Sequence, residues 1–127
     1  MALTPSKSAP TAAAAPRLSL RIDLASGARI GPGKVRLLEE IARSGSISAA
    51  GRALKMSYRR AWELVEDLNR HIGTPMVTTA AGGSGGGGAR LTEAGQILIA
   101  EYRAIEQATE AAASDHMATL ARLCESV

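Results

Sequence analysis

The chain has 127 residues and a formal net charge of +3, and it contains no phenylalanine, one tryptophan and two tyrosines. This length allows one domain whose core must come from aliphatic side chains, and so small a core favours pairing with a second copy. No run of about 18 apolar residues is present, which excludes a membrane-spanning helix, and the single cysteine, Cys124, excludes an internal disulfide.

The charges are unevenly distributed along the chain. Residues 1–31 carry four cations and one acid, residues 32–71 carry eight cations and five acids, and residues 72–127 carry three cations and six acids. Because a polyanion responds to a local basic patch more than to the net charge, the middle of the chain is the expected contact region for such a partner. Considered alone, these charges are equally compatible with a solvated surface of mixed charge.

The chain begins with a segment of low complexity followed by a short hairpin. Residues 1–16 are rich in Ala, Pro, Ser and Thr and are expected to form a disordered tail. They lack the pattern of a secretory signal, which together with the lone cysteine favours a cytoplasmic protein. Residues 17–24 alternate polar with apolar side chains and predict a strand, residues 25–27 a turn, and residues 28–30 a short antiparallel partner.

Two helices are predicted next. Apolar residues at helical spacing predict a helix over 32–44, which begins with a proline and ends where Gly45 permits a left-handed stop. The second helix begins with Ser46 or Ser48 as its cap and ends at about Leu54. Its many Ala and Gly residues allow another helix to approach closely, as the crossing in a helix-turn-helix requires.

A third helix is predicted from a cap at Ser57 to about Ile72. One stripe of this helix is apolar and is expected to face the core: Ala61, Leu64, Val65, Leu68 and Ile72. Arg59, Arg60 and Glu63 then lie on the opposite side, so the helix is anchored by one face and presents the other. Such a pair of helices predicts a helix-turn-helix directed at DNA.

A second hairpin follows the helix-turn-helix. Residues 76–79 are β-prone, residues 82–88 are nearly all glycine, and residues 89–91 can form the returning strand, which together predict the wing of a winged helix. Thr92 can cap a long final helix. Ser114 and Asp115 predict a break in that helix and the start of another.

The final helices carry an apolar stripe that is expected to be either ordinary core or half of a dimer seam. The residues assigned to dimerisation are Leu98, Tyr102, Ile105, Thr109, Ala112, Leu120 and Leu123. We therefore expect a mainly α fold with a small β component, a winged helix-turn-helix with a long C-terminal dimerisation helix. Its domains are predicted as a tail over 1–16, a DNA-binding domain over 17–91 and a dimerisation region over 92–127.

Three stretches carry a family resemblance: SGSIS at 44–48, Ser57-Tyr58 with Ala61-Trp62 in SYRRAW at 57–62, and GGSGGGGARLTEAG at 82–95. In this order they resemble the N-terminal domain of the ModE family of molybdate-responsive transcriptional regulators, which is itself similar to the winged helices of LysR-type regulators. The resemblance covers roughly residues 17–113. It implies a winged helix-turn-helix fold and control of molybdenum-related genes.

The chain departs from the family pattern in three places. Full-length ModE-like proteins continue into molybdate-binding domains, for which no room is expected before Val127, so molybdate sensing is not carried over. Lys55 stands where the turn between the two helices often has Gly, and because a left-handed backbone there would cost about 1 kcal/mol, a differently shaped turn is left open. Ser84 interrupts the glycines where a cation would strengthen a phosphate contact.

The start of the third helix carries the expected DNA contacts. Arg59 and Arg60 can bind guanine in the major groove, while the hydroxyls of Ser57 and Tyr58 suit phosphates. The alternative is a solvated face on which Glu63 neutralises one arginine. The expected DNA-binding residues are Ser46, Ser48, Arg52, Lys55, Ser57, Tyr58, Arg59, Arg60, Glu63, Ser84, Gly85, Gly86 and Arg90.

Two neighbouring features admit other interpretations. Trp62 can stack on a base, but beside Ala61 and Val65 it is expected to be partly buried packing. The glycine loop could be a flexible linker, whereas its flanking strands favour a wing. Nucleotide binding is not expected, because no Gly-Lys-Ser/Thr and no Rossmann-type acid follows the loop. Arg90, just after the loop, is expected to contact the minor groove or a phosphate.

The sequence thus predicts a sequence-specific DNA-binding transcriptional regulator that lacks its own molybdate-binding domain. It is expected to bind a palindromic duplex as a homodimer. One alternative is an interaction module that does not bind DNA and pairs with a full-length regulator, and another is a small molybdate-binding protein. Neither His71 nor His116 stands in a cluster of ligands or catalytic partners, so no enzyme, metal site or cofactor is expected.

Overall fold

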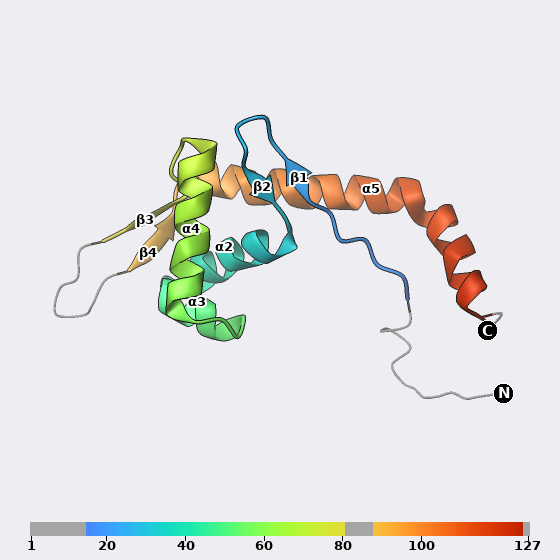
Figure 1. Cartoon of the computed structure of the whole chain (residues 1–127), viewed down its shortest axis with the longest axis horizontal. Coiled ribbons are helices and arrows are strands. Elements are labelled where there is room, and N and C mark those ends of the chain that lie inside the picture. The colour runs from blue at the N-terminus through green and yellow to red at the C-terminus, as the bar shows by residue number, and fades with distance from the viewer. Residues whose placement is uncertain (1–14, 81–87, 126–127) are drawn as a thin grey trace. The chain divides into compact units, whose positions relative to one another are not determined.

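The structure, a computed structural model, describes residues 15–80 and 88–125. Chain contacts divide the protein into a compact unit of residues 19–104 and a second unit of residues 1–18 and 105–127. Helices predominate, and the described strands form two small antiparallel ribbons, which confirms the predicted fold class. In chain order the elements labelled in Figure 1 are β1 (Ile22–Asp23), β2 (Arg29–Ile30), α2 (Pro32–Ser44), α3 (Ile47–Ala53), α4 (Tyr58–Ile72), β3 (Val77–Thr79), β4 (Ala89–Leu91) and α5 (Glu93–Glu125).

The ends of the first helices follow from local signals. Pro32 occupies the first turn of α2, and Gly45 ends it with a left-handed φ of 73°, donating its N–H to the Ile41 carbonyl at 2.8 Å. Ser46 then caps α3, because its side chain accepts the backbone N–H of Ala49 at 3.0 Å. The predicted helix ends are confirmed, and of the two predicted caps the structure selects Ser46.

The first hairpin is shorter than predicted. The expected strand over 17–24 is reduced to β1, which pairs with β2 in the register Ile22 to Ile30 and Asp23 to Arg29. The returning chain reaches Pro32 two residues after β2 ends, and there it begins α2, so no further strand residues remain to extend the ladder.

The core lies where α2, α3, α4 and the base of the second hairpin meet. It consists of Ile30, Val35, Leu37, Leu38, Ile41, Ile47, Ala50, Ala61, Val65, Leu68, Met76, Val77, Ala89 and Tyr102. Gly51 permits the close crossing of α3 and α4, because a Cβ there would lie 3.2 Å from the Met56 carbonyl oxygen and 3.3 Å from the Ala61 Cβ. The predicted role of small residues in this crossing is confirmed at that position.

The second hairpin is anchored to the helices on both sides. Ala89 on β4 donates its N–H to the carbonyl oxygen of Gly45 at 2.9 Å. Asn69 on α4 accepts the Met76 N–H at 2.7 Å, and its amide donates to the Val77 carbonyl at 3.4 Å. These bonds fix the base of the wing relative to α4 within the unit of residues 19–104.

The last element is a single helix. Thr92 caps α5 by accepting the Gly95 N–H at 3.0 Å, as predicted. The predicted break at Ser114 and Asp115 is wrong, because α5 continues through both residues to Glu125. Both side chains are exposed and need no desolvation, and the alanines around them favour the helical backbone. No helix in the described part of the chain is long and apolar enough to cross a membrane.

Candidate nucleic-acid interface

The beginning of α4 presents basic side chains to solvent. Arg59 has a side chain that is 88% exposed, and Arg60 is exposed beside it, whereas Ala61 and Val65 on the other face are buried in the core. Arg59 Nε lies 3.4 Å from a carboxylate oxygen of Glu63. Because so exposed an ion pair contributes little, Arg59 can exchange this partner for another anion at small cost.

Serine hydroxyls stand at the starts of both helices. Ser57 caps α4 by accepting a backbone N–H at 3.0 Å, and Ser46 caps α3 in the same manner. Ser48 in the first turn of α3 accepts from the guanidinium of Arg52 at 2.9 Å. Since each of these oxygens acts as an acceptor in its bond, each hydroxyl retains a proton that it can donate.

The turn between α3 and α4 keeps the left-handed backbone that a glycine often supplies at this position, so the different turn shape considered from the sequence is not formed. Lys55 has a φ of 60°, and its N–H donates to the Arg52 carbonyl at 3.1 Å. The next residue, Met56, returns the chain by donating to the Gly51 carbonyl at 2.9 Å. Lys55 is therefore exposed in the tight turn that precedes α4.

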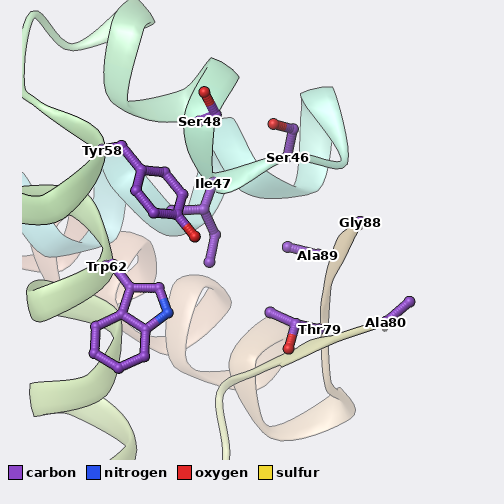
Figure 2. A pocket seen from close by; sticks show the side chains of 9 residues that line it. All are labelled: Ser46, Ile47, Ser48, Tyr58, Trp62, Thr79, Ala80, Gly88 and Ala89. Carbon is purple, nitrogen blue, oxygen red and sulfur yellow. The ribbon is translucent and has the colours of Figure 1, made fainter. Parts of the chain in front are cut away.

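A pocket of about 290 Å³ lies between α3, the first turns of α4 and the base of the wing (Figure 2). It brings together three of the predicted DNA-binding residues, Ser46, Ser48 and Tyr58. The other six lining residues were not among the predicted DNA contacts: Ile47, Trp62, Thr79, Ala80, Gly88 and Ala89. Trp62, which the sequence predicts as partly buried packing, is 44% exposed and forms part of the pocket wall. Tyr58, one helical turn earlier, is 57% exposed.

The wing contributes one further predicted residue that the structure describes. Arg90 is exposed on β4, where it pairs in register with Thr78 on β3. The predicted residues Ser84, Gly85 and Gly86 lie outside the described residues. Sequence reasoning did not identify the bonds of Asn69 that hold this hairpin, because a single Asn within a helix gives no local indication of its partner.

A cluster of ion pairs stabilises the opposite end of α4. Lys34 on α2 donates to a carboxylate oxygen of Asp67 at 2.9 Å. This hydrogen bond lowers the pKa of Asp67 below its usual value. Partial desolvation acts to raise this pKa, whereas the charges of Lys34, His71 and Arg70 lower it further. His71 Nδ1 and Arg70 approach the same carboxylate at 3.0 and 3.4 Å.

The residues predicted for dimerisation divide into two groups. The assignment of Tyr102 is wrong, because it is 2% exposed and donates its hydroxyl to the Leu20 carbonyl at 2.7 Å within its own core. Leu98 also packs against that core. In the second unit Thr109 is half-buried and Ala112 exposed. Three large apolar side chains are more than a third exposed, namely Ile105 at 41%, Leu120 at 58% and Leu123 at 62%.

The donors and charges of this surface fit an anionic polymer. Four cations, Arg52, Lys55, Arg59 and Arg60, are exposed within nine consecutive residues that contain no acid. Within the described ranges, no group of three or more His, Cys, Asp or Glu residues is placed to hold a metal ion.

Comparison with known proteins gives consistent results. A family model described as bacterial regulatory helix-turn-helix protein, lysR family, matches residues 33–96. Among curated proteins, the chain is 53% identical over 80 residues to the molybdenum-pterin-binding protein MopB of Rhodobacter capsulatus, covering 63% of this chain and 30% of MopB. It is 38% identical over 90 residues to the molybdenum transport protein ModE of Azotobacter vinelandii, covering 71% of this chain and 33% of that protein.

The fold is similar to that of the protein in the crystal structure of the CbnR_DBD-DNA complex. The TM-score is 0.54 at 19% identity, over 69% of this chain and 95% of that one. The chain spans about a third of the length of the curated relatives named above.

Proposed function

The chain belongs to the lysR family of bacterial regulatory helix-turn-helix proteins, and from this premise we propose that it is a sequence-specific DNA-binding transcriptional regulator. The observation that carries the proposal is the arrangement of α4, whose apolar face is buried while Arg59 and Arg60 are exposed at its beginning. No other described element covers this basic end of the helix, so a groove of duplex DNA can receive it. The proposal involves no catalytic step and places the protein in the cytoplasm with the bacterial DNA.

Each predicted residue has a role in this proposal. The beginning of α4 enters the major groove, where Arg59 and Arg60 read base edges. Glu63, on the same outward face of α4, also lies toward the base edges. Ser57 and Tyr58 contact phosphates near the same groove, and the remaining contacts to the backbone or the next groove come from Ser46, Ser48, Arg52, Lys55, Ser84, Gly85, Gly86 and Arg90.

We further propose that two copies associate through α5. Ile105, Leu120 and Leu123 lie close to one stripe of this helix, since they are separated by 15 and 3 positions, and all three are exposed. Burial of such a stripe against a second copy removes apolar surface from water. A two-fold dimer would place its two recognition helices about 34–36 Å apart, in successive major grooves, which requires a palindromic site.

The names of the relatives suggest which genes are controlled. MopB is named as molybdenum-pterin-binding and ModE as a molybdenum transport protein. We therefore propose that this protein regulates genes concerned with molybdenum. Molybdate binding is not part of the proposal, because the matched region is only about a third of those relatives.

The first experiment is selection of bound duplexes from a random pool by the purified chain, followed by anisotropy titration at two salt concentrations. We expect a palindromic consensus and an affinity that falls steeply with salt, because each phosphate contact releases a counterion. Absence of binding, or binding independent of salt, would contradict the proposed function.

A pair of variants tests the groove assignment within the same assay. Arg59→Ala is expected to weaken binding to the selected site by about 1–3 kcal/mol and to relax base preference at one position in each half-site. Lys55→Ala is expected to weaken binding to selected and unrelated duplexes by the same factor and to lower the salt slope by about one. If both variants change base preference equally, α4 does not enter the groove as proposed.

A further inference from the structure

The pocket beside α4 has a lining that the proposed base contacts leave unexplained. Its walls come from three places: the start of α3, the side chains of Tyr58 and Trp62 on α4, and the base of the wing (Figure 2). The aromatic rings face the wing residues Thr79 and Ala89 across the opening. Two partly exposed aromatic residues in an open hollow are unusual for a region whose only task is packing.

The lining residues that the structure describes supply hydrogen-bond donors and apolar surface, and none of them is charged. The Tyr58 hydroxyl oxygen and the Trp62 ring nitrogen both lie on the side of the rings that faces the wing (Figure 2). The indole N–H can only donate, and the hydroxyls of Ser46 and Thr79 add further donors. Since none of the described lining residues is a lysine, arginine, aspartate or glutamate, their chemistry suits an acceptor-rich group joined to an apolar one.

We propose that this pocket holds one sugar-phosphate unit of the DNA backbone, with the phosphate on the donors of Tyr58 and Trp62 and the deoxyribose against their rings. The inference rests on the proposed function and specifies how the duplex is positioned. Trp62 thereby becomes a positioning residue of the interface.

The location of the pocket favours the backbone over a base. With α4 in the major groove and the wing toward the neighbouring groove, the DNA strand that separates the two grooves passes between them. The pocket lies between these two elements. Base edges are instead reached by the outward face of α4, which carries Arg59 and Glu63.

The test combines two conservative variants with a scan of single neutral methylphosphonates along the selected duplex. Tyr58→Phe removes one hydroxyl, and Trp62→Phe removes the indole N–H but keeps an aromatic ring. In wild-type protein, neutralising one particular phosphate in each half-site is expected to reduce affinity about tenfold, as loss of a hydrogen bond to a charged group does. Each variant should lose several-fold on the natural duplex and lose nothing further when that phosphate is neutral.

Matched controls make the outcome specific. Ser26→Ala, which removes an exposed hydroxyl in the turn between β1 and β2, should bind like wild type on every duplex. Circular dichroism and thermal unfolding of each variant establish that its fold is kept. Because Trp62 is the single tryptophan of the chain, its emission should also shift to shorter wavelength and be shielded from acrylamide when the selected duplex is added.

Three results would overturn the inference. Variant losses that are the same on natural and methylphosphonate duplexes would show that no phosphate sits in the pocket. Losses that instead disappear when one thymine is replaced by uracil would assign the pocket to a base methyl group. A saturable change in Trp62 emission with inorganic phosphate or molybdate alone would make it a free-oxyanion site. In each case DNA binding by wild type would persist, whereas failure of wild type to bind any duplex would reject the proposed function as well.

Discussion

At the scale of single residues, the two ends of α4 handle charge in opposite ways. At its beginning Arg59 and Arg60 are exposed, and the one described ion pair there, to Glu63, is long and solvated. Toward its end, Asp67 forms an ion pair with Lys34 of α2, and the Lys34 side chain is only 16% exposed. The first arrangement leaves cations available to an incoming polyanion, while the second uses opposite charges to fasten α4 to α2.

The Lys34–Asp67 pair predicts a specific dependence of stability on pH. Because the hydrogen bond from Lys34 lowers the pKa of Asp67 in the folded chain, the carboxylate stabilises the fold fully above its unfolded pKa of about 3.9. This contribution is lost as pH falls through the lower folded pKa. Asp67→Asn should reduce the free energy of unfolding by about 1 kcal/mol at pH 7 and flatten its decline below about pH 4.

Urea unfolding of both proteins at a series of pH values measures this difference. Glu101→Gln is the matched control, since Glu101 is exposed and forms no ion pair with any residue of 15–80 and 88–125. This control should retain the acid-induced loss of stability. An Asp67→Asn variant with the wild-type pH profile would show that the pair contributes nothing to the fold.

At the scale of elements, the position of the wing depends on contacts between segments far apart in the chain. The carbonyl of Met76 before β3 accepts the N–H of Thr92, which caps α5, at 3.0 Å. Gly95 in the first turn of α5 packs directly against the same carbonyl group. The base of the wing and the beginning of α5 are therefore fixed by one crowded junction, which also orients the pocket wall formed by β3 and β4.

Alanine substitutions at two helical glycines, Gly95 in this junction and Gly33 outside it, are expected to change the free energy of unfolding in opposite directions. A Cβ at Gly95 would overlap the Met76 carbonyl oxygen, so Gly95→Ala should lower the free energy of unfolding by about 1–3 kcal/mol. Beyond its chain neighbours and the backbone of its own helix, a Cβ at Gly33 in α2 would meet no described atom within 4 Å, so Gly33→Ala should raise the free energy of unfolding by about 0.5–1 kcal/mol. Chemical denaturation measures both values. If the two changes have the same sign, the close contact at Gly95 is not a constraint on the fold.

At the scale of the whole molecule, the function proposed for the chain requires association of two copies. The core contains no phenylalanine, and the second unit exposes large apolar side chains on α5. Tyr102, one of the predicted seam residues, is instead used within its own chain, so the proposed contact is confined to the exposed residues of the helix. Association would supply the two-fold symmetry that a palindromic site requires.

The double variant Leu120→Glu with Leu123→Glu is expected to shift the protein toward monomer, because it places charge on the proposed apolar contact. Sedimentation equilibrium over a range of concentrations measures the change, and affinity for a full palindrome should fall toward that for a half-site. Gln107→Glu adds a charge on the opposite side of α5 and should leave both unchanged. A double variant that stays dimeric would place the interface elsewhere.

Local sequence signals predicted much of the fold and part of the candidate site. Pro32, Gly45 and Ser57 fix helix ends through their own backbone and side-chain chemistry, so the ends of α2 and the start of α4 followed from the sequence. At Lys55 the sequence left a differently shaped turn open, whereas the structure has a left-handed backbone there, with a φ of 60°. The predicted DNA contacts remain predictions that the proposed experiments test.

The sequence by itself determined the order of elements, the helix-turn-helix and the basic beginning of α4, because periodicity, caps and charge act over a few neighbouring residues. Only the tertiary structure decided that Trp62 lines an open pocket and that Tyr102 belongs to the core. Both outcomes depend on which distant segment packs beside a side chain: β3 and β4 stand across from Trp62, and Leu20 accepts the hydroxyl of Tyr102. Helical spacing gives the direction of a side chain around its own axis, and only the packed neighbour determines whether water or protein lies there.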